Sequence, residues 1–376
     1  MTLSALSKRL CVPLLIPAGL LIAIGLLSIA RYGAILELGH GLLYRQIVWA
    51  AVGLTAMVAA TVPNYRVLIR WAYPLFLVSL LLLIAVYLFP PVNNARRWIR
   101  VGPLGFQPSE FAKAAYILAL ACYLMYRENH RQFLGLLLPL ALTLIPVLLI
   151  LREPDLGTAL VFLPVFFVMV FTAGARWRHL SLLVVLGLLT VPLLWSQMSG
   201  EQRSRVRSLF NQTTAEMTPD DEAYHLHQAK QVMALGGVGG SWIAGQALDD
   251  SAAYRLPEAR SDFVFCVIAE RFGWLGIFAT LALYGLLVWR GLLVASEARE
   301  PFGRLLVTGT MALFAVEVLI NTGMTVGLLP ITGLSLPLIS YGGSGMVAHL
   351  TMLGLVMNVG SRPDYEMTKE PFRFVE

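Results

Sequence analysis

Long apolar runs recur along almost the whole chain and limit its fold more than any other feature. A helix needs about 20 predominantly apolar residues to cross the hydrocarbon core of a bilayer. Ten segments fit this length, near residues 11–30, 46–62, 68–89, 109–126, 133–151, 156–173, 180–198, 263–289, 305–328 and 342–360. We therefore predict an all-α, polytopic integral membrane protein with about ten transmembrane helices; the hydropathy is also compatible with nine or eleven.

The composition agrees with a membrane protein. Hydrophobic residues make up 57% of the chain and charged residues 13%, whereas soluble domains carry roughly a quarter charged residues. No separate polar block indicates a second globular unit, so residues 1–376 are expected to form a single membrane domain. The first apolar run follows Lys8 and Arg9, but it is long for a signal peptide and lacks a clear cleavage site, so it is predicted to be a retained signal anchor.

The lysines and arginines of the short loops set the expected orientation. Fourteen of them lie in loops on the side of the N-terminus, and six lie in the opposite short loops. Both termini are therefore predicted to face the cytoplasm, with residues 361–376 as a cytoplasmic tail. The long loop 199–261 is predicted to be extracytoplasmic. The net charge of +6 reflects this topology and does not indicate binding of nucleic acid.

The predicted outer segment 93–113 is basic on the side where arginine is normally scarce. Its Arg96, Arg97 and Arg100 flank Trp98, an aromatic residue suited to the membrane interface. Two interpretations are open for these side chains. They anchor the chain at the interface, or they form a cationic surface for an anionic headgroup such as a lipid pyrophosphate, since guanidinium groups pair well with phosphate oxygens.

Two pairs of polar residues lie within or at the entrance of apolar spans. Glu110 and Lys113 stand three residues apart, and Glu317 and Asn321 stand four apart, so each pair shares one face of its helix. Capping, ion pairing or a polar link between helices explains them structurally. Alternatively they line a cavity, because charged side chains inside a span rarely face lipid.

Five blocks of sequence resemble the SEDS family, which includes RodA, FtsW and SpoVE. They are Arg97-Trp98-Ile99 with Gln107-Pro108-Ser109-Glu110-x-x-Lys113, the run Glu153 to Leu160, Tyr224-His225-x-x-Gln228-Ala229-Lys230, Pro257-Glu258-x-x-Ser261-Asp262-Phe263-x-Phe265, and the run Asn321 to Ser344. The blocks follow the family's order and span nearly the whole chain. The stretch 224–240 is more similar to the elongation-type members, RodA, than to the division-type members, FtsW.

The resemblance implies an enzyme of the bacterial plasma (inner) membrane whose active face is extracytoplasmic. Such an enzyme polymerises lipid II into glycan strands during cell elongation and cell-shape maintenance, and it releases undecaprenyl pyrophosphate. The implied protein partner is a class B penicillin-binding protein, a transpeptidase that crosslinks the strands. A divalent cation, Mg²⁺ or Mn²⁺, is an expected cofactor from the resemblance alone, with Asp155 and Asp262 as its candidate ligands.

The expected reaction needs a base for the acceptor hydroxyl and cations for the leaving pyrophosphate. Because an α-linked donor becomes a β-linked product, one inverting displacement with a single carboxylate base suffices. By its position alone Asp262 is a helix cap or a base, and the resemblance implies that it is the catalytic base. Arg260 and Ser261 stand where the family usually has histidine and threonine; a permanent cation here weakens Asp262 as a base while helping to bind phosphate.

The same blocks supply the candidate substrate-binding residues. They are Arg97, Trp98, Gln107, Glu110, Lys113, Asp155, Gln228, Lys230, Arg260, Asn321, Ser340, Tyr341 and Ser344. Asp155 is either a helix cap or a second carboxylate of the cavity. The glycine-rich and proline-rich loop 333–345 is expected to pack against protein or to line a wet cavity, because unsatisfied amides are costly in lipid. Gly345 stands where the family usually has a second serine.

Two other functions compete with the enzyme. A flippase for the same lipid fits the spans and buried charges equally well, and a non-catalytic scaffold for a penicillin-binding protein fits the unusual Arg260. The polar candidates map to the outer ends of the spans, whereas a transporter places its charged site near the midplane of the bilayer. This placement favours the glycosyltransferase.

Overall fold

The computed structural model describes residues 12–35, 40–63, 65–91, 95–102, 104–125, 132–197, 200, 203–204, 206–207, 222–244 and 259–362. Most of the predicted outer loop 199–261, and the predicted tail beyond Arg362, lie outside these described residues.

Helices make up most of the described chain. In order they are α2 (Val12–Ile35), α3 (Gly41–Thr61), α4 (Tyr65–Ala85), α5 (Pro108–Met125), α6 (Leu137–Arg152), α7 (Leu156–Thr172), α8 (Trp177–Gln197), α10 (Glu222–Leu235), α11 (Gly240–Ala244), α12 (Val264–Glu297), α13 (Pro301–Val326) and α14 (Gly343–Gly360). Short 3-10 turns, η1 (Val86–Leu88) and η3 (Leu134–Leu136), extend α4 and precede α6. A two-stranded antiparallel hairpin, β1 (Ile99–Val101) and β2 (Leu104–Phe106), leads into α5.

Each of the ten predicted spans overlaps one of these helices, so the all-α, polytopic class is confirmed. Among the described residues, seven helices are long and apolar enough to cross a membrane. The apolar stretches of α7 and α8 are shorter. The helix α5 is less apolar because its first two turns contain Glu110 and Lys113. The helix α12 continues past the predicted end of its span, to Glu297.

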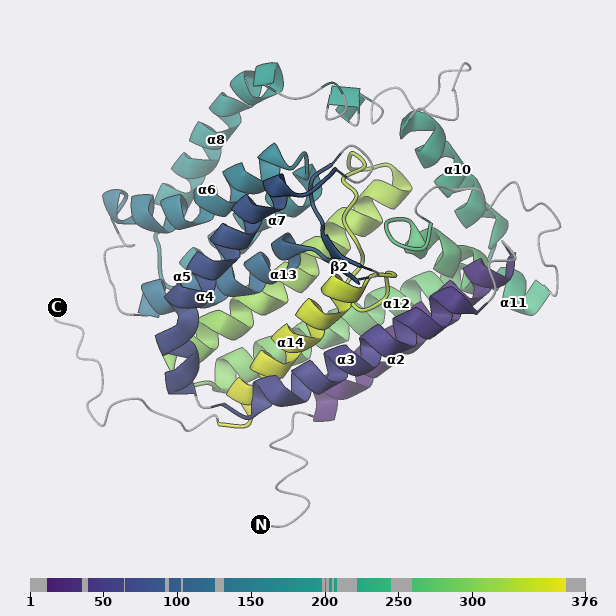
Figure 1. Cartoon of the computed structure of the whole chain (residues 1–376), viewed down its shortest axis with the longest axis horizontal. Helices are drawn as coiled ribbons and strands as arrows, with labels where there is room; N and C mark the ends of the chain where they lie inside the picture. Colours follow the sequence, from purple (N-terminus) through teal and green to yellow (C-terminus); the bar gives the residue numbers. More distant parts are fainter. Residues whose placement is uncertain are drawn as a thin grey trace, which may run out of the picture.

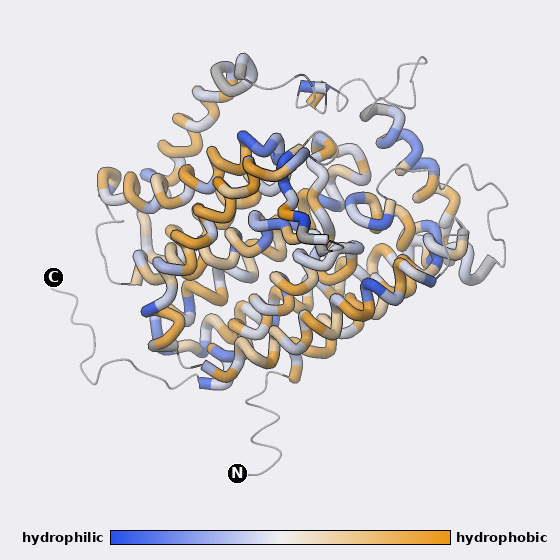
Figure 2. The backbone as a smooth tube through the Cα atoms, in the orientation of Figure 1, coloured by the Kyte–Doolittle hydropathy of each residue, from blue (hydrophilic) through white to orange (hydrophobic). Residues whose placement is uncertain are grey.

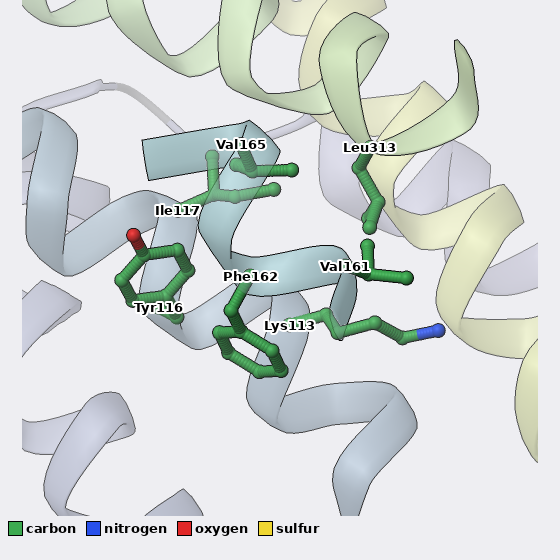
Figure 3. A pocket seen from close by; sticks show the side chains of 7 residues that line it. All are labelled: Lys113, Tyr116, Ile117, Val161, Phe162, Val165 and Leu313. Atoms are coloured by element: carbon green, nitrogen blue, oxygen red, sulfur yellow. The ribbon is translucent and has the colours of Figure 1, made fainter. Parts of the chain in front are cut away.

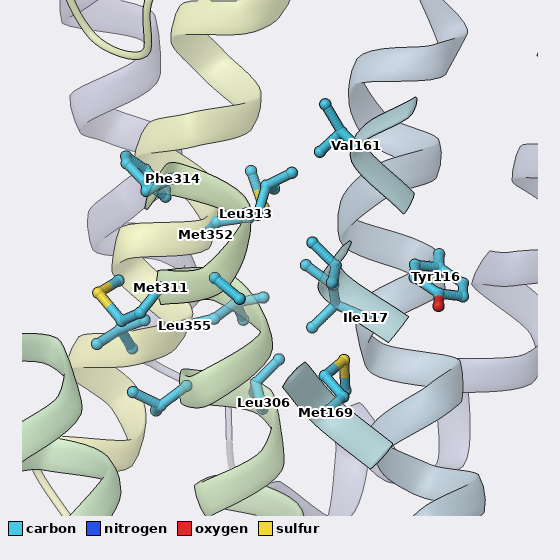
Figure 4. Close-up of a cluster of buried hydrophobic side chains, with 14 of the residues drawn as sticks. Tyr116, Ile117, Val161, Met169, Leu306, Met311, Leu313, Phe314, Met352 and Leu355 are labelled. Atoms are coloured by element: carbon cyan, nitrogen blue, oxygen red, sulfur yellow. The ribbon is translucent and has the colours of Figure 1, made fainter. Parts of the chain in front are cut away.

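The helices α5, α13 and α14 form the buried centre of the molecule (Figure 1). The helix α13 packs against α5, α7 and α12, and α14 lies along α3. Apolar side chains of α13 and α14 face those of α5 and α7, as Figure 4 shows for Leu313, Ile117 and Met169. These central helices therefore fix the positions of any polar groups that they carry.

The outer helices consist largely of hydrophobic residues (Figure 2). On α4, α6 and α8, the side chains of Leu77, Leu148 and Leu189 are exposed. A soluble protein rarely exposes such a continuous apolar surface, whereas a bilayer requires one. The helices α8 and α10 lie at the edge of the view in Figure 1.

Glycines allow α14 to approach α3 closely. A Cβ atom added to Gly354 would lie 2.2 Å from the carbonyl oxygen of Met57, and one added to Gly343 would lie 2.4 Å from the ring of Trp49. Small residues at helix interfaces in membranes let the backbones come together in this way. Because the obstacle at Gly354 is backbone, a side chain there must push the two helices apart.

We expect Gly354→Ala to lower the melting temperature of the detergent-solubilised protein. The matched control is Gly19→Ala on α2, where an added Cβ meets nothing within 4 Å. Both changes gain the same helix propensity, about 1 kcal/mol, so the difference between them isolates the clash with α3. Equal melting temperatures for the two variants would show that the α3–α14 contact is not tight.

Candidate functional site

Asp262 lies, half-buried, in the turn that leads into α12. Its backbone carbonyl accepts a hydrogen bond of 2.8 Å from the side-chain Nδ2 of Asn321. The same Nδ2 donates to the carbonyl of Leu334 at 2.6 Å. Asn321 is fully buried in α13. One amide therefore ties the Asp262 turn to the segment that follows α13.

The segment 327–342 between α13 and α14 is not helical, and most of its residues from 331 onward are buried. Side chains satisfy its backbone groups. The hydroxyl of Ser340 donates to the carbonyl of Ser261 at 2.5 Å and accepts from the N–H of Leu336 at 2.7 Å. Gln46 on α3 donates to the Ser340 carbonyl and accepts from the N–H of Gly342. The prediction that this segment packs against protein is confirmed.

Arg260 is attached to the same segment. Its carbonyl accepts a hydrogen bond of 2.9 Å from the N–H of Tyr341, and its guanidinium lies 5.3 Å from the centre of the Tyr341 ring. Such stacking on an aromatic face holds a guanidinium in place while leaving its N–H groups free to bind an anion. Ser340, Tyr341 and Arg260 thus form one wall beside Asp262.

A second wall consists of Arg97 and the loop between α6 and α7. The Nη1 of Arg97 lies 3.8 Å from Oδ1 of Asp155, and its Nε donates to the Glu153 carbonyl at 3.4 Å. Its Nη2 donates to the carbonyl of Pro154. Asp155 also caps α7, because its carboxylate accepts from the N–H and the hydroxyl of Thr158 at 3.2 and 3.0 Å. The cap predicted for Asp155 is therefore confirmed, and Asp155 pairs with Arg97 as well.

The two walls meet at Gly333. A Cβ atom added there would lie 3.4 Å from Oδ2 of Asp262 and 3.9 Å from Nη1 of Arg97. Gly333 has a φ of 72°, in the left-handed region that favours glycine. A carboxylate and a guanidinium from distant parts of the sequence thus approach a single point.

The hairpin before α5 is joined to the start of α14. The N–H of Gln107 donates to the hydroxyl of Ser344 at 3.1 Å, and that hydroxyl donates to the carbonyl of Gly105 at 3.3 Å. The ring of Trp98 packs over Gly105, 3.3 Å from the position of an added Cβ. Three of the candidate substrate-binding residues therefore position the hairpin that follows Arg97. They are Trp98, Gln107 and Ser344.

Glu110 and Lys113 lie deeper, with exposed fractions of 4% and 2%. The Nζ of Lys113 is 2.9 Å from Oε1 of Glu110 and 2.5 Å from Oε1 of Glu317, and Oε2 of Glu317 is 2.7 Å from Nε2 of His349. Figure 3 shows the Lys113 chain passing Phe162, with its nitrogen directed away from the apolar cluster. The space there is too small for a water molecule.

This buried network settles the structural interpretation of Glu317, which links helices. The sequence did not single out His349, because a lone histidine in an apolar helix gives no sign of its partner. Oε2 of Glu110 has no hydrogen-bond partner among the described residues. It lies 3.4 Å from an added Cβ of Gly345, where the family's usual serine would stand.

The helix α10 carries Gln228, which is buried, and Lys230, which is half-buried. It packs against α12 and α13, so both candidates lie beside these two helices. The glycines after α10 lie against the backbone of α12. A Cβ on Gly236 would lie 2.0 Å from the carbonyl oxygen of Ala269 on α12.

Glu153 is a polar residue of the site that the sequence did not list as a candidate. Its side chain is fully buried, and neither carboxylate oxygen has a hydrogen-bond partner among the described residues. Burial raises its pKa from the usual 4.5 to about 8, and the negative charge of Asp155 acts in the same direction, against the opposing effect of Arg97. The Glu153 carboxyl is therefore mostly protonated at neutral pH.

Asp155 and Asp262 are the candidate ligands for a divalent ion. Within the part of the chain that the structure describes, no three His, Cys, Asp or Glu side chains come together in a way that could hold a metal. Both oxygens of Asp155 already accept hydrogen bonds from Thr158. Asp155 and Asp262 would therefore bind Mg²⁺ or Mn²⁺ only together with oxygens of a bound pyrophosphate.

Comparisons with known proteins agree with one another. The family model for FtsW, RodA and SpoVE, described as cell cycle protein, matches residues 7–364. The peptidoglycan glycosyltransferase MrdB of Escherichia coli K12 is 38% identical over 323 residues, 85% of each chain. A probable peptidoglycan glycosyltransferase FtsW of Geobacter metallireducens is 35% identical over 332 residues, 86% of each chain.

Two solved structures share the fold. One is a peptidoglycan synthase complex that coordinates polymerization and crosslinking, with a TM-score of 0.81 and 35% identity over 94% of this chain and 98% of that one. The other is the rod shape determining protein RodA of Thermus thermophilus, with a TM-score of 0.69 and 33% identity over 94% and 97%.

We expect Glu153→Gln to make the protein more stable than the wild type at alkaline pH. The folded protein holds the Glu153 proton up to about pH 8, whereas the unfolded chain releases it near 4.5. Wild-type stability is therefore lost as the pH rises from 4.5 through 8, and the neutral amide removes this loss.

The measurement is the melting temperature of the detergent-solubilised protein from pH 5 to pH 9. The difference between Glu153→Gln and the wild type should be small at pH 5 and should grow in favour of the variant up to about pH 8. Glu297→Gln, at an exposed position at the end of α12, is the control and should show no such growth. A constant difference for Glu153→Gln would mean that Glu153 is ionised in the fold.

Proposed function

The chain belongs to the family of FtsW, RodA and SpoVE and is a peptidoglycan glycosyltransferase of the elongation type, and we propose that it polymerises lipid II where Asp262 and Arg97 converge. Transfer of a sugar from a pyrophosphate donor needs a base and a cation close together. The approach of the Asp262 carboxylate and the Arg97 guanidinium to one point beside Gly333 meets this need. That convergence is the observation that carries the proposal.

In the proposed reaction, Asp262 takes the proton from the acceptor sugar hydroxyl. The freed oxygen forms a bond to the anomeric carbon of the donor, and the bond from that carbon to the pyrophosphate breaks. The electron pair leaves with undecaprenyl pyrophosphate, and the configuration at the anomeric carbon inverts. One carboxylate suffices, because no covalent intermediate with the protein is formed.

Arg97 is proposed to offset the charge that develops on the leaving pyrophosphate. Two backbone carbonyls and Asp155 already hold its guanidinium, so little reorganisation is needed during the reaction. Arg260, stacked on Tyr341, is proposed to bind a phosphate oxygen from the other wall. The stacking also holds the Arg260 guanidinium at the Tyr341 ring. This limits the effect of its positive charge on Asp262 as a base.

The setting of the enzyme follows from the relatives and the charge pattern. The relatives are membrane-bound, and the long apolar helices of this chain indicate the same. We propose that both termini are cytoplasmic and that the site faces outward, because the lysines and arginines favour the N-terminal side. A class B penicillin-binding protein is the proposed partner, by similarity to the complex that couples polymerization to crosslinking. Mg²⁺ or Mn²⁺ remains the proposed cofactor, bound with substrate oxygens and supplying further positive charge at the pyrophosphate.

We expect Asp262→Asn to lower kcat for lipid II polymerisation by about 100-fold or more, the scale of a lost general base. The assay uses the full purified chain, with and without its penicillin-binding partner, and measures glycan polymer. The amide keeps the shape of the carboxylate, and the fold should survive because Asn321 binds the backbone of residue 262 and not its side chain. The remote Glu297→Gln is the control.

Each outcome separates the candidate functions. Full polymerisation by Asp262→Asn would exclude Asp262 as the base. Movement of lipid II across vesicle membranes without any polymer from the wild type would indicate a flippase. If the wild type neither polymerises nor moves lipid II while its penicillin-binding partner remains active, the result would indicate a scaffold.

A further inference from the structure

We propose that Glu317 and His349 are positioning residues of this glycosyltransferase, which as a hydrogen-bonded pair hold Lys113 and the first turn of α5 in place. The proposal rests on the proposed function, because its readout is the rate of polymerisation. The four titratable side chains Glu110, Lys113, Glu317 and His349 are here called the buried relay. They come from three different helices, α5, α13 and α14.

The geometry of the buried relay is a single connected chain. The Lys113 ammonium bridges two carboxylates, at 2.9 Å to Glu110 and 2.5 Å to Glu317. His349 approaches the remaining oxygen of Glu317 at 2.7 Å. The ring of His349 also meets Phe314 edge-on, with the ring centres 5.2 Å apart. Every member is at least nine-tenths buried, so none of these contacts depends on solvent.

The Glu317 carboxylate is the centre of the buried relay. Lys113 contacts its Oε1 and His349 contacts its Oε2, so side chains of two other helices satisfy both oxygens. Tyr284, a further titratable side chain near Glu317, donates its hydroxyl to the Pro337 carbonyl instead. Removing one partner of a buried ionisable group is strongly destabilising, so His349 supports the contact of Glu317 with Lys113.

The buried relay is connected to both walls of the site. On α13, Glu317 lies one turn from Asn321, which holds the Asp262 backbone. On α5, Glu110 follows Gln107, whose N–H holds the start of α14 through Ser344. The buried relay thus fixes α13 against α5. The helix α13 positions Asp262, and α5 follows the hairpin that comes after Arg97. A shift of about 1 Å between reacting groups can cost about 100-fold in rate.

The test uses three variants of the full chain with its penicillin-binding partner and lipid II: His349→Leu, Glu317→Leu and the double variant. His349→Leu leaves Oε2 of the buried Glu317 without its hydrogen-bond partner, so we expect the lowest melting temperature of the three. The double variant removes the pair as a unit and leaves Lys113 paired with Glu110, so its melting temperature should recover. Its kcat should nevertheless stay about tenfold or more below wild type, with KM within about twofold, because positioning is lost.

Two further variants separate positioning from mere stability. Glu317→Gln combined with His349→Gln keeps polar contacts without the Glu317 charge and should restore most of kcat. Tyr116→Phe removes a buried hydrogen bond of 2.8 Å to Thr143 one turn along α5; it should lower the melting temperature and leave kcat per folded molecule unchanged.

Two results would overturn the proposal. Wild-type kcat in the double leucine variant would show that the pair does not position the site. A double variant less stable than both single variants would show that the two side chains do not act as a pair. If the wild type makes no polymer, the proposed function itself fails and the positioning role fails with it, while the melting temperatures still decide whether the pair exists.

Discussion

The side-chain amide of Asn321 donates to the Asp262 and Leu334 carbonyls, and the arrangement of the site depends on these two hydrogen bonds. Chain that leaves a helix within a membrane protein cannot present unpaired amides to lipid. A buried side chain must therefore satisfy the backbone after α13, and Asn321 does so while also fixing the turn before α12. Beside this segment, the Asp262 carboxylate and the Arg97 guanidinium both approach the point where a Cβ atom on Gly333 would lie.

The titratable residues near the site divide into two sets with different physical roles. Arg97 and Asp262 are partly exposed, and both approach the same point beside Gly333. The buried relay is closed to solvent, and its members contact one another. The outer set suits electrostatic work on a substrate, because both of its side chains are partly exposed. The inner set suits a different purpose, which is to hold helices together at fixed positions.

Much of the fold could be predicted from the sequence, because each span needs its own run of apolar residues and the runs are local. The helix cap by Asp155 was also predictable, since it depends on Thr158 three residues away. The partner of His349 was not, because it depends on how α13 and α14 pack. The protonated state of Glu153 was hidden for the same reason, since burial and not sequence raises its pKa. Similarity to known sequences pointed to Asp262, but only the fold shows that Arg97 approaches it.

The central claim is that the convergence of Asp262 and Arg97 beside Gly333 is where the pyrophosphate donor binds. A structure of the full chain in a lipid nanodisc with undecaprenyl pyrophosphate bound tests it most directly. The predicted result is a pyrophosphate in hydrogen-bond contact with the Arg97 guanidinium, next to Asp262. A pyrophosphate bound elsewhere on the chain, with Arg97 still paired only to Asp155 and its neighbouring carbonyls, would contradict it.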